Sequence, residues 1–91
     1  MQIEWTLEGY EDLERLWEFL ALVNLPAAEK TRQHLLIAPE LLPDNPRIGE
    51  RLEEYDPREV RCLIVGSYEM RYEIKGEIIS IVRLWHTRED R

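Results

Sequence analysis

The sequence of 91 residues holds one cysteine, and this scarcity excludes several kinds of site. Cys62 has no second cysteine to pair with, so the chain forms no intramolecular disulfide, which is typical of cytoplasmic proteins. With two histidines beside it, the cysteine falls short of the four ligands of a structural zinc site. We therefore expect neither a metal nor another cofactor.

Long apolar runs are also absent. No stretch approaches the roughly 20 consecutive apolar residues of a membrane-spanning helix. The first residues, MQIEWTLEG, lack the basic segment followed by an apolar segment that marks a secretory signal. The sequence thus predicts no membrane contact and a cytoplasmic location.

Basic residues are in the minority, and the formal net charge is −7. The acidic excess lies in residues 1–56, whereas residues 57–91 are nearly neutral. A protein that wraps nucleic acid needs a basic surface. We therefore expect no sequence-specific nucleic-acid binding, while a protein partner stays compatible with this charge.

Apolar residues make up 44% of the chain, which is enough for one modest core. The length and composition predict a single domain over residues 1–91. Residues 2–5 alternate polar and apolar side chains, as a short strand does. Thr6 is then in position to cap a helix from Leu7 to about Val23.

This first helix has one apolar stripe, because large apolar side chains recur at spacings of three and four. Its members are Tyr10, Leu13, Leu16, Trp17, Leu20 and Val23. The acidic side chains between them, Asp12 included, are expected to form a solvent-exposed face.

A second helix is predicted from about Ala27 to Ile37, with Pro26 at its first position. Pro39 removes a backbone donor, so this helix must end or kink near Ile37. The short connection makes the two helices an antiparallel hairpin. Residues 43–57 hold three prolines and read as a loop, with one helical turn at 50–54.

Residues 59–88 read as three antiparallel strands in a meander, because β-branched and aromatic residues dominate between two short breaks. Gly66-Ser67 forms the first turn, so Val65 pairs with Tyr68, and Lys75–Glu77 holds the second turn. The expected fold is α+β: an N-terminal strand, a helical hairpin, and this meander, with the helices packed on one sheet face.

Alternation along the strands assigns the two sheet faces. The more apolar face, which should carry the helices, collects Arg61, Leu63, Val65, Tyr68, Met70, Tyr72, Ile74, Ile79, Ile81, Arg83 and Trp85. The other, open face collects Val60, Cys62, Ile64, Glu69, Arg71, Glu73, Lys75, Ile78, Ser80, Val82, Leu84 and His86. On the helix face, Tyr68 and Tyr72 are expected in the core. Arg61 and Arg83 must there reach the rim or pair with carboxylates.

Several segments together resemble the ParE/RelE superfamily of toxins from bacterial toxin–antitoxin pairs. They are EDLERLWEFL in the first helix, PRIG at residues 46–49, VRCLIV at 60–65, YEMRY at 68–72 and IVRLWHTR at 81–88. The resemblance implies one of two activities. RelE-like members cut mRNA on the ribosome without a metal, and ParE-like members bind DNA gyrase.

The residues on the predicted open face favour the ParE-like activity. The ribonucleases place Lys and Arg at positions that align with Val60, Cys62 and Glu69, and a carboxylate there would repel the charge that develops during cleavage. An alternative catalytic set would use His86, with Arg71 and Arg88, as acid, base and phosphate ligands. Cys62 reads as a buried or half-buried apolar residue.

The leading hypothesis is a ParE-like toxin that inhibits gyrase by binding and is neutralised by a cognate, ParD-like antitoxin. The antitoxin segment is expected to lie over the helical hairpin and along the sheet edge, and to carry some Lys or Arg. The partner-binding candidates are Arg58, Arg71, His86, Arg88, Trp17 and Leu20, with the tail 88–91 as a further gyrase contact. The alternatives are a ribosome-dependent endoribonuclease and a non-toxic interaction module.

Overall fold

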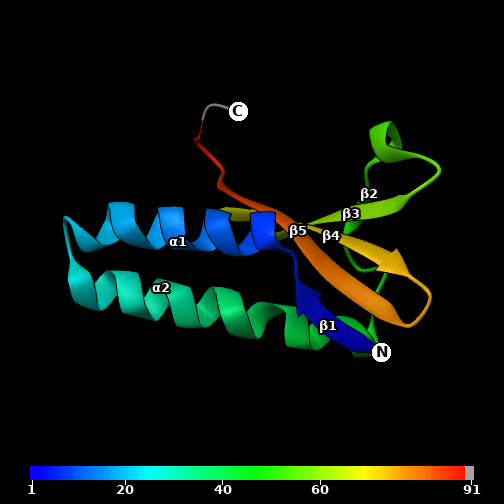
Figure 1. Cartoon of the computed structure of the whole chain (residues 1–91), viewed down its shortest axis with the longest axis horizontal. Helices are drawn as coiled ribbons and strands as arrows, with labels where there is room; N and C mark the ends of the chain where they lie inside the picture. The colour runs from blue at the N-terminus through cyan, green and yellow to red at the C-terminus, as the bar shows by residue number, and fades with distance from the viewer. Residues whose placement is uncertain (90–91) are drawn as a thin grey trace.

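The computed structural model describes residues 1–89 and has the α+β architecture that the sequence predicts. Its elements are β1 (Gln2–Trp5), α1 (Leu7–Ala21), α2 (Leu25–Ile37), the 3₁₀ helix η1 (Ala38–Asp44), β2 (Glu50–Arg51), the 3₁₀ helix η2 (Glu53–Tyr55), β3 (Glu59–Val65), β4 (Tyr68–Lys75) and β5 (Ile78–His86). Figure 1 shows α1 and α2 side by side as a hairpin that projects beyond the sheet.

Both helices begin at the caps that the sequence supplies. The Thr6 hydroxyl oxygen accepts a hydrogen bond from the Gly9 amide at 3.1 Å, and the Asn24 side chain accepts one from Ala27 at 3.1 Å. Helix α2 ends at Ile37, as Pro39 requires, and the chain continues as η1. Helix α1 ends at Ala21, two residues before the predicted Val23.

The sheet has five strands in the order β1-β5-β4-β3-β2, with β1 parallel to β5 and every other pair antiparallel. The short strand β2 lies where a helical turn was predicted, and η2 follows it. In β2, Glu50 pairs with Cys62 and Arg51 with Arg61. Two residues are too few to show strand alternation, so this strand could not be predicted from the pattern of side chains.

The two meander turns are confirmed. Val65 pairs with Tyr68, as predicted, and Gly76-Glu77 forms the second turn. Gly66 and Gly76 have φ angles of +59° and +60°. These left-handed conformations suit glycine and allow the tight two-residue turns that keep the strands in register.

A β-bulge makes the predicted faces wrong beyond Ile81. Arg71 pairs with Arg83 and Tyr72 with Ile81, so Val82 is an extra residue without a counterpart on β4. One extra residue shifts the alternation by one position, so the side chains that follow it on β5 point to the opposite face of the sheet from the one predicted. Leu84 and His86 therefore join the helix side, and Arg83 and Trp85 join the open face.

The core lies between the helices and the sheet. It consists of Leu13, Leu16, Leu35, Leu42, Met70, Tyr72, Ile74, Ile79, Ile81 and Leu84. The predicted core position is confirmed for Tyr72, which is fully buried, whereas Tyr68 is partly buried and packs against the cluster from outside. The Tyr72 hydroxyl accepts from the Gly49 amide at 3.0 Å and donates to the Pro46 carbonyl at 2.7 Å, which anchors the loop before β2.

Helix α1 closes the edge of β5 where the pairing with β1 ends at Ile81. The Asp12 carboxylate accepts from the Leu84 amide at 2.9 Å and from the Arg83 Nε at 2.8 Å. Asp12 is 5% exposed, so its predicted place on a solvent-exposed acidic face is wrong. Side chains of α1 here occupy the place of a further strand and protect the edge of the sheet.

The two arginines expected to need carboxylate partners have them. Arg61 donates to Glu59 at 2.9 Å and to the Gly49 carbonyl at 2.7 Å, and Arg83 pairs with Asp12.

Within residues 1–89, no helix has the length and apolar character needed to cross a membrane.

Candidate functional site

An open groove of about 540 Å³ lies between the second half of α1 and the neighbouring ends of β4 and β5. We call it the α1–β5 groove. Its lining residues are Leu16, Phe19 and Leu20 of α1, Tyr68 of β4, His86 of β5, and Arg15, Arg88 and Glu89. Phe19 is 71% exposed, and an apolar concave surface of this kind is typical of a protein-binding site.

The β-bulge places His86 in this groove. The His86 ring stands edge-on to Tyr68, with a centroid separation of 5.3 Å. Its Nδ1 atom accepts a hydrogen bond from the Arg88 amide at 3.1 Å. The imidazole is thus fixed between an aromatic ring and the chain that follows β5.

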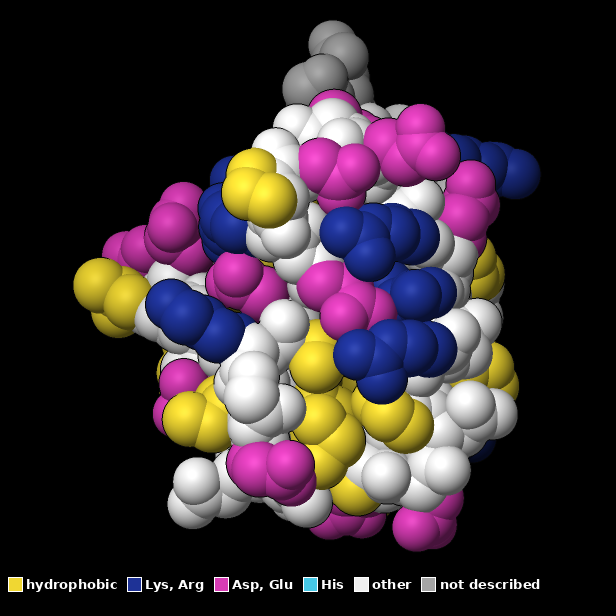
Figure 2. Space-filling view, turned by 90° about the vertical axis from the view of Figure 1, so that its right-hand side faces the viewer, with side chains coloured by type: hydrophobic (Ala, Val, Ile, Leu, Met, Phe, Trp, Pro, Cys, Tyr) yellow, Lys and Arg dark blue, Asp and Glu magenta, His cyan; other side chains and the backbone are white. Residues whose placement is uncertain are grey.

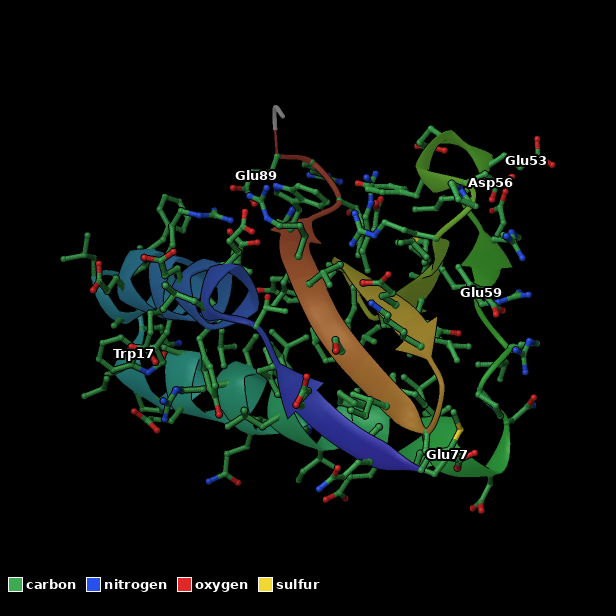
Figure 3. All side chains as sticks on the ribbon, turned by 45° about the vertical axis from the view of Figure 1, so that its right-hand side comes forward. Trp17, Glu53, Asp56, Glu59, Glu77 and Glu89 are labelled. Atoms are coloured by element: carbon green, nitrogen blue, oxygen red, sulfur yellow. The ribbon has the colours of Figure 1, made fainter. Side chains whose placement is uncertain are left out.

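The chain after β5 folds back toward α1. The Thr87 amide donates to the Ser67 carbonyl at 2.8 Å, and the Glu89 carboxylate accepts from the His86 amide at 3.0 Å. The other oxygen of Glu89 pairs with the Arg15 guanidinium. Figure 3 places Glu89 beyond the end of β5, whereas Glu77 lies at the opposite end of that strand. Of the predicted tail 88–91, residues 90 and 91 lie outside the described part.

On the open face, arginines stack on an aromatic ring. The guanidinium carbons of Arg71 and Arg83 each lie 4.7 Å from the centre of the Trp85 ring, which favours cation–π attraction. Arg71 also donates to the Tyr55 hydroxyl at 2.8 Å and to Glu69 at 2.9 Å. These contacts hold Arg71 against the sheet.

The structure separates the residues of the alternative catalytic set. Arg71 lies on the open face, whereas His86 and Arg88 line the groove on the helix side. Val60, one of the positions at which a ribonuclease would carry a cation, is fully buried. Arg58 donates to both oxygens of Glu73, each at 3.0 Å.

The side of the molecule that carries β2 shows a column of basic side chains bordered by acidic ones (Figure 2). Arg47 pairs with Glu59 at 2.9 Å, and Arg51 pairs with Asp56 at 2.9 Å. Both of these positive charges thus have a negative neighbour, which weakens the attraction of this side for phosphate.

The two helix residues predicted to bind a partner differ in position. The Trp17 indole nitrogen donates to Glu29 of α2 at 3.0 Å and so joins the two helices (Figure 3). Leu20 lines the α1–β5 groove. Phe19 and Glu89 were not predicted as groove residues. Phe19 could have been found, because a large apolar side chain outside the apolar stripe of α1 indicates an exposed contact surface.

Within residues 1–89, no three His, Cys, Asp or Glu side chains gather as a metal site.

The Cys62 thiol should be unreactive in the folded chain. Burial, and next the nearby Glu69 carboxylate, raise the pKa of Cys62 to about 11. Because the thiolate is the reacting species, a thiol reagent should modify native Cys62 about 100-fold more slowly than a free cysteine at neutral pH. Absorbance of the released reagent gives the rate, and the urea-unfolded chain is the control. Equal rates in both states would contradict this prediction.

The comparisons with known proteins give a family and a similar solved fold. Residues 3–91 match the family described as "ParE toxin of type II toxin-antitoxin system, parDE". Among solved structures, a chain of the "Chromosomal ParDE TA system from P. aeruginosa" superposes with a TM-score of 0.78 at 22% identity, over 94% of this chain and 95% of that chain. At this identity, the likeness shows the fold. The comparison with curated proteins finds no match.

The family match covers nearly the whole length, from the residue after Gln2 to the last residue of the sequence. The segments that resemble the superfamily lie in α1, before β2, and in β3, β4 and β5 of the structure. The chain belongs to the ParE family of toxins of type II toxin–antitoxin systems.

Proposed function

We propose that this toxin acts in the cytoplasm by binding DNA gyrase and inhibiting it, and that a ParD-like antitoxin neutralises the toxin by docking in the α1–β5 groove. The observation that carries the choice of activity is the separation of Arg71 from His86 by the sheet. Metal-independent RNA cleavage needs a proton acceptor and phosphate-binding cations on one site. Here Arg71 lies on the other side of the sheet from His86, the Nδ1 atom of His86 already accepts from the Arg88 amide, and Arg15 is paired with Glu89. Inhibition by binding is therefore favoured.

The groove supports an antitoxin as its occupant. It is the place where Leu20, Phe19 and Tyr68 leave an apolar surface open beside charged groups. Such a surface suits an amphipathic segment that inserts apolar side chains between polar contacts. The related solved structure is titled as a ParDE system, which fits a toxin that meets an antitoxin.

Expression of the chain in bacteria tests the activity. We expect plasmid supercoiling to be lost and DNA breaks to appear, without new cuts in ribosome-bound mRNA. The His86→Ala variant should behave like the parent in the mRNA assay. Cuts in mRNA that His86→Ala abolishes would instead establish the ribonuclease. Growth without any defect would favour the interaction module and contradict the toxin activity.

The Phe19→Asp variant tests the groove. Phe19 is mostly exposed, so the unfolding free energy should change little, whereas a charge in the apolar groove should weaken antitoxin binding by about tenfold or more. Calorimetric titration with the protein encoded by the reading frame adjoining the toxin gene measures this loss. Phe19→Leu, which keeps the site apolar, is the control. Unchanged binding of Phe19→Asp would place the antitoxin elsewhere.

A further inference from the structure

We infer that Glu89 fills a carboxylate-binding site that the antitoxin uses, so that an Asp or Glu of the antitoxin displaces Glu89 when it binds. The site consists of the Arg15 guanidinium and the His86 amide, beside the apolar wall of the α1–β5 groove. This inference rests on the proposed function of the groove and adds the chemistry of its occupant: an apolar side chain with a carboxylate next to it.

The β5 edge creates the need for an acceptor. The amides of Leu84 and His86, two residues apart, both point away from the sheet at this edge, and each donates to a carboxylate. A backbone amide left without an acceptor on docking would cost free energy. A partner that covers this edge must therefore supply an acceptor at His86 or leave Glu89 in place.

The two carboxylates at this edge differ in how firmly they are held. Asp12 is 5% exposed and accepts hydrogen bonds from Leu84, Arg83 and Arg15. The Glu89 side chain is 28% exposed, and its partner Arg15 is 44% exposed. An ion pair between such exposed groups is weak. Asp12 is thus a fixed part of the fold, whereas Glu89 is replaceable.

The charges select a carboxylate as the replacing group. Removal of Glu89 would leave Arg15 and Arg88 facing the groove together with an unsatisfied amide. A carboxylate oxygen accepts from both a guanidinium and an amide, and such charge-assisted hydrogen bonds are stronger than neutral ones. The overall acidity of the toxin predicts a basic antitoxin, but at this position the antitoxin should be acidic.

Binding of the adjoining-frame protein to the parent toxin and to Glu89→Ala tests the inference. Glu89→Ala removes the internal competitor, so affinity should rise about threefold to tenfold. Arg15→Ala should lower affinity about tenfold, because it removes the charged donor. Glu77→Ala changes the net charge equally at the far end of β5 and should leave affinity unchanged (Figure 3).

The partner side completes the experiment. Each Asp of the antitoxin is changed to Asn, and each Glu to Gln, one at a time. One of these changes should weaken binding to the parent toxin but should not weaken binding to the Arg15→Ala toxin any further. Equal or weaker binding by Glu89→Ala would overturn the inference while leaving the antitoxin intact as partner. Absence of binding by every variant, the parent included, would instead overturn the proposed function.

Sedimentation of the toxin alone covers the other possible occupant, the tail of a second copy of the chain. We expect the parent and Glu89→Ala to sediment as the same species. A dimer of the parent that Glu89→Ala dissociates would assign the carboxylate site to a second copy and overturn the antitoxin as its occupant.

Discussion

Replacement of Asp12 by alanine is expected to lower the free energy of unfolding by about 3 kcal/mol, because it leaves buried donors without an acceptor. The Asp12 carboxylate accepts from Arg83 at 2.8 Å, from the Leu84 amide at 2.9 Å and from Arg15 at 3.3 Å. The arginines can turn toward water, since their side chains are partly exposed. The Leu84 amide lies in the buried edge of β5 and cannot, which accounts for most of the loss.

Urea unfolding followed by circular dichroism measures this difference. Glu11→Ala is the matched control, because Glu11 is the exposed neighbour on α1 and its loss changes the net charge equally. This control should stay within about 0.5 kcal/mol of the parent. Similar losses for both variants would mean that Asp12 acts only through the net charge of the helix.

The same carboxylate predicts how stability depends on pH. Burial by itself raises the pKa of Asp12, but the hydrogen bonds from Arg83 and Leu84 outweigh it and hold the pKa below its ordinary value of 3.8. A depressed pKa contributes stability that is present above the ordinary value and is lost as the pH falls through the folded-state value. Asp12→Asn should therefore flatten the loss of stability in acid, and an unchanged acid limb would contradict this assignment.

Replacement of Gly9 by alanine should also destabilise the chain, by about 2 kcal/mol, although alanine is the better helix former. A Cβ atom on Gly9 would lie 2.5 Å from the Ile81 carbonyl oxygen. This oxygen cannot move aside easily, because it accepts from the Thr6 amide at 3.0 Å and from the Thr6 hydroxyl at 3.1 Å. The added methyl group must therefore push α1 away from β5.

The sign of the effect makes this a sharp test. Helix propensity alone predicts that Gly9→Ala gains about 1 kcal/mol, whereas the close approach predicts a loss. Thermal and urea unfolding give the sign, and Gln33→Ala on the exposed side of α2 controls for alanine substitution in a helix. A Gly9→Ala variant more stable than the parent would show that α1 does not lie this close to β5.

Much of the fold could be predicted because local signals specify it. Thr6 caps α1, Pro39 ends α2, and Gly66 makes a tight turn, and each acts within a few residues of its position. The apolar stripe and the strand alternation then bring helices and sheet together. These features depend on residue type and spacing, which the sequence displays directly.

The candidate site could be predicted less well, because one extra residue in β5 decides which face of the sheet the following side chains occupy. Val82 bulges out of the β4–β5 pairing and moves His86 from the open face to the groove. Valine is an ordinary strand residue, so nothing in its type marks the bulge. Asp12 was likewise missed, because an acidic residue on a helix is usually solvated and its partners lie more than 70 residues away. Long-range contacts of this kind are invisible to local patterns.

The parallel pairing of β1 with β5 has a consequence for how the toxin is made. The first strand and the start of α1 dock on Ile78–Leu84, which are synthesised more than 70 residues later. Until then, the first helix has its apolar stripe and its Asp12 carboxylate without their partners, and contacts so distant in sequence form slowly. During translation, a nascent toxin therefore holds an incomplete groove, and the finished surface exists only once the last strand has joined the first.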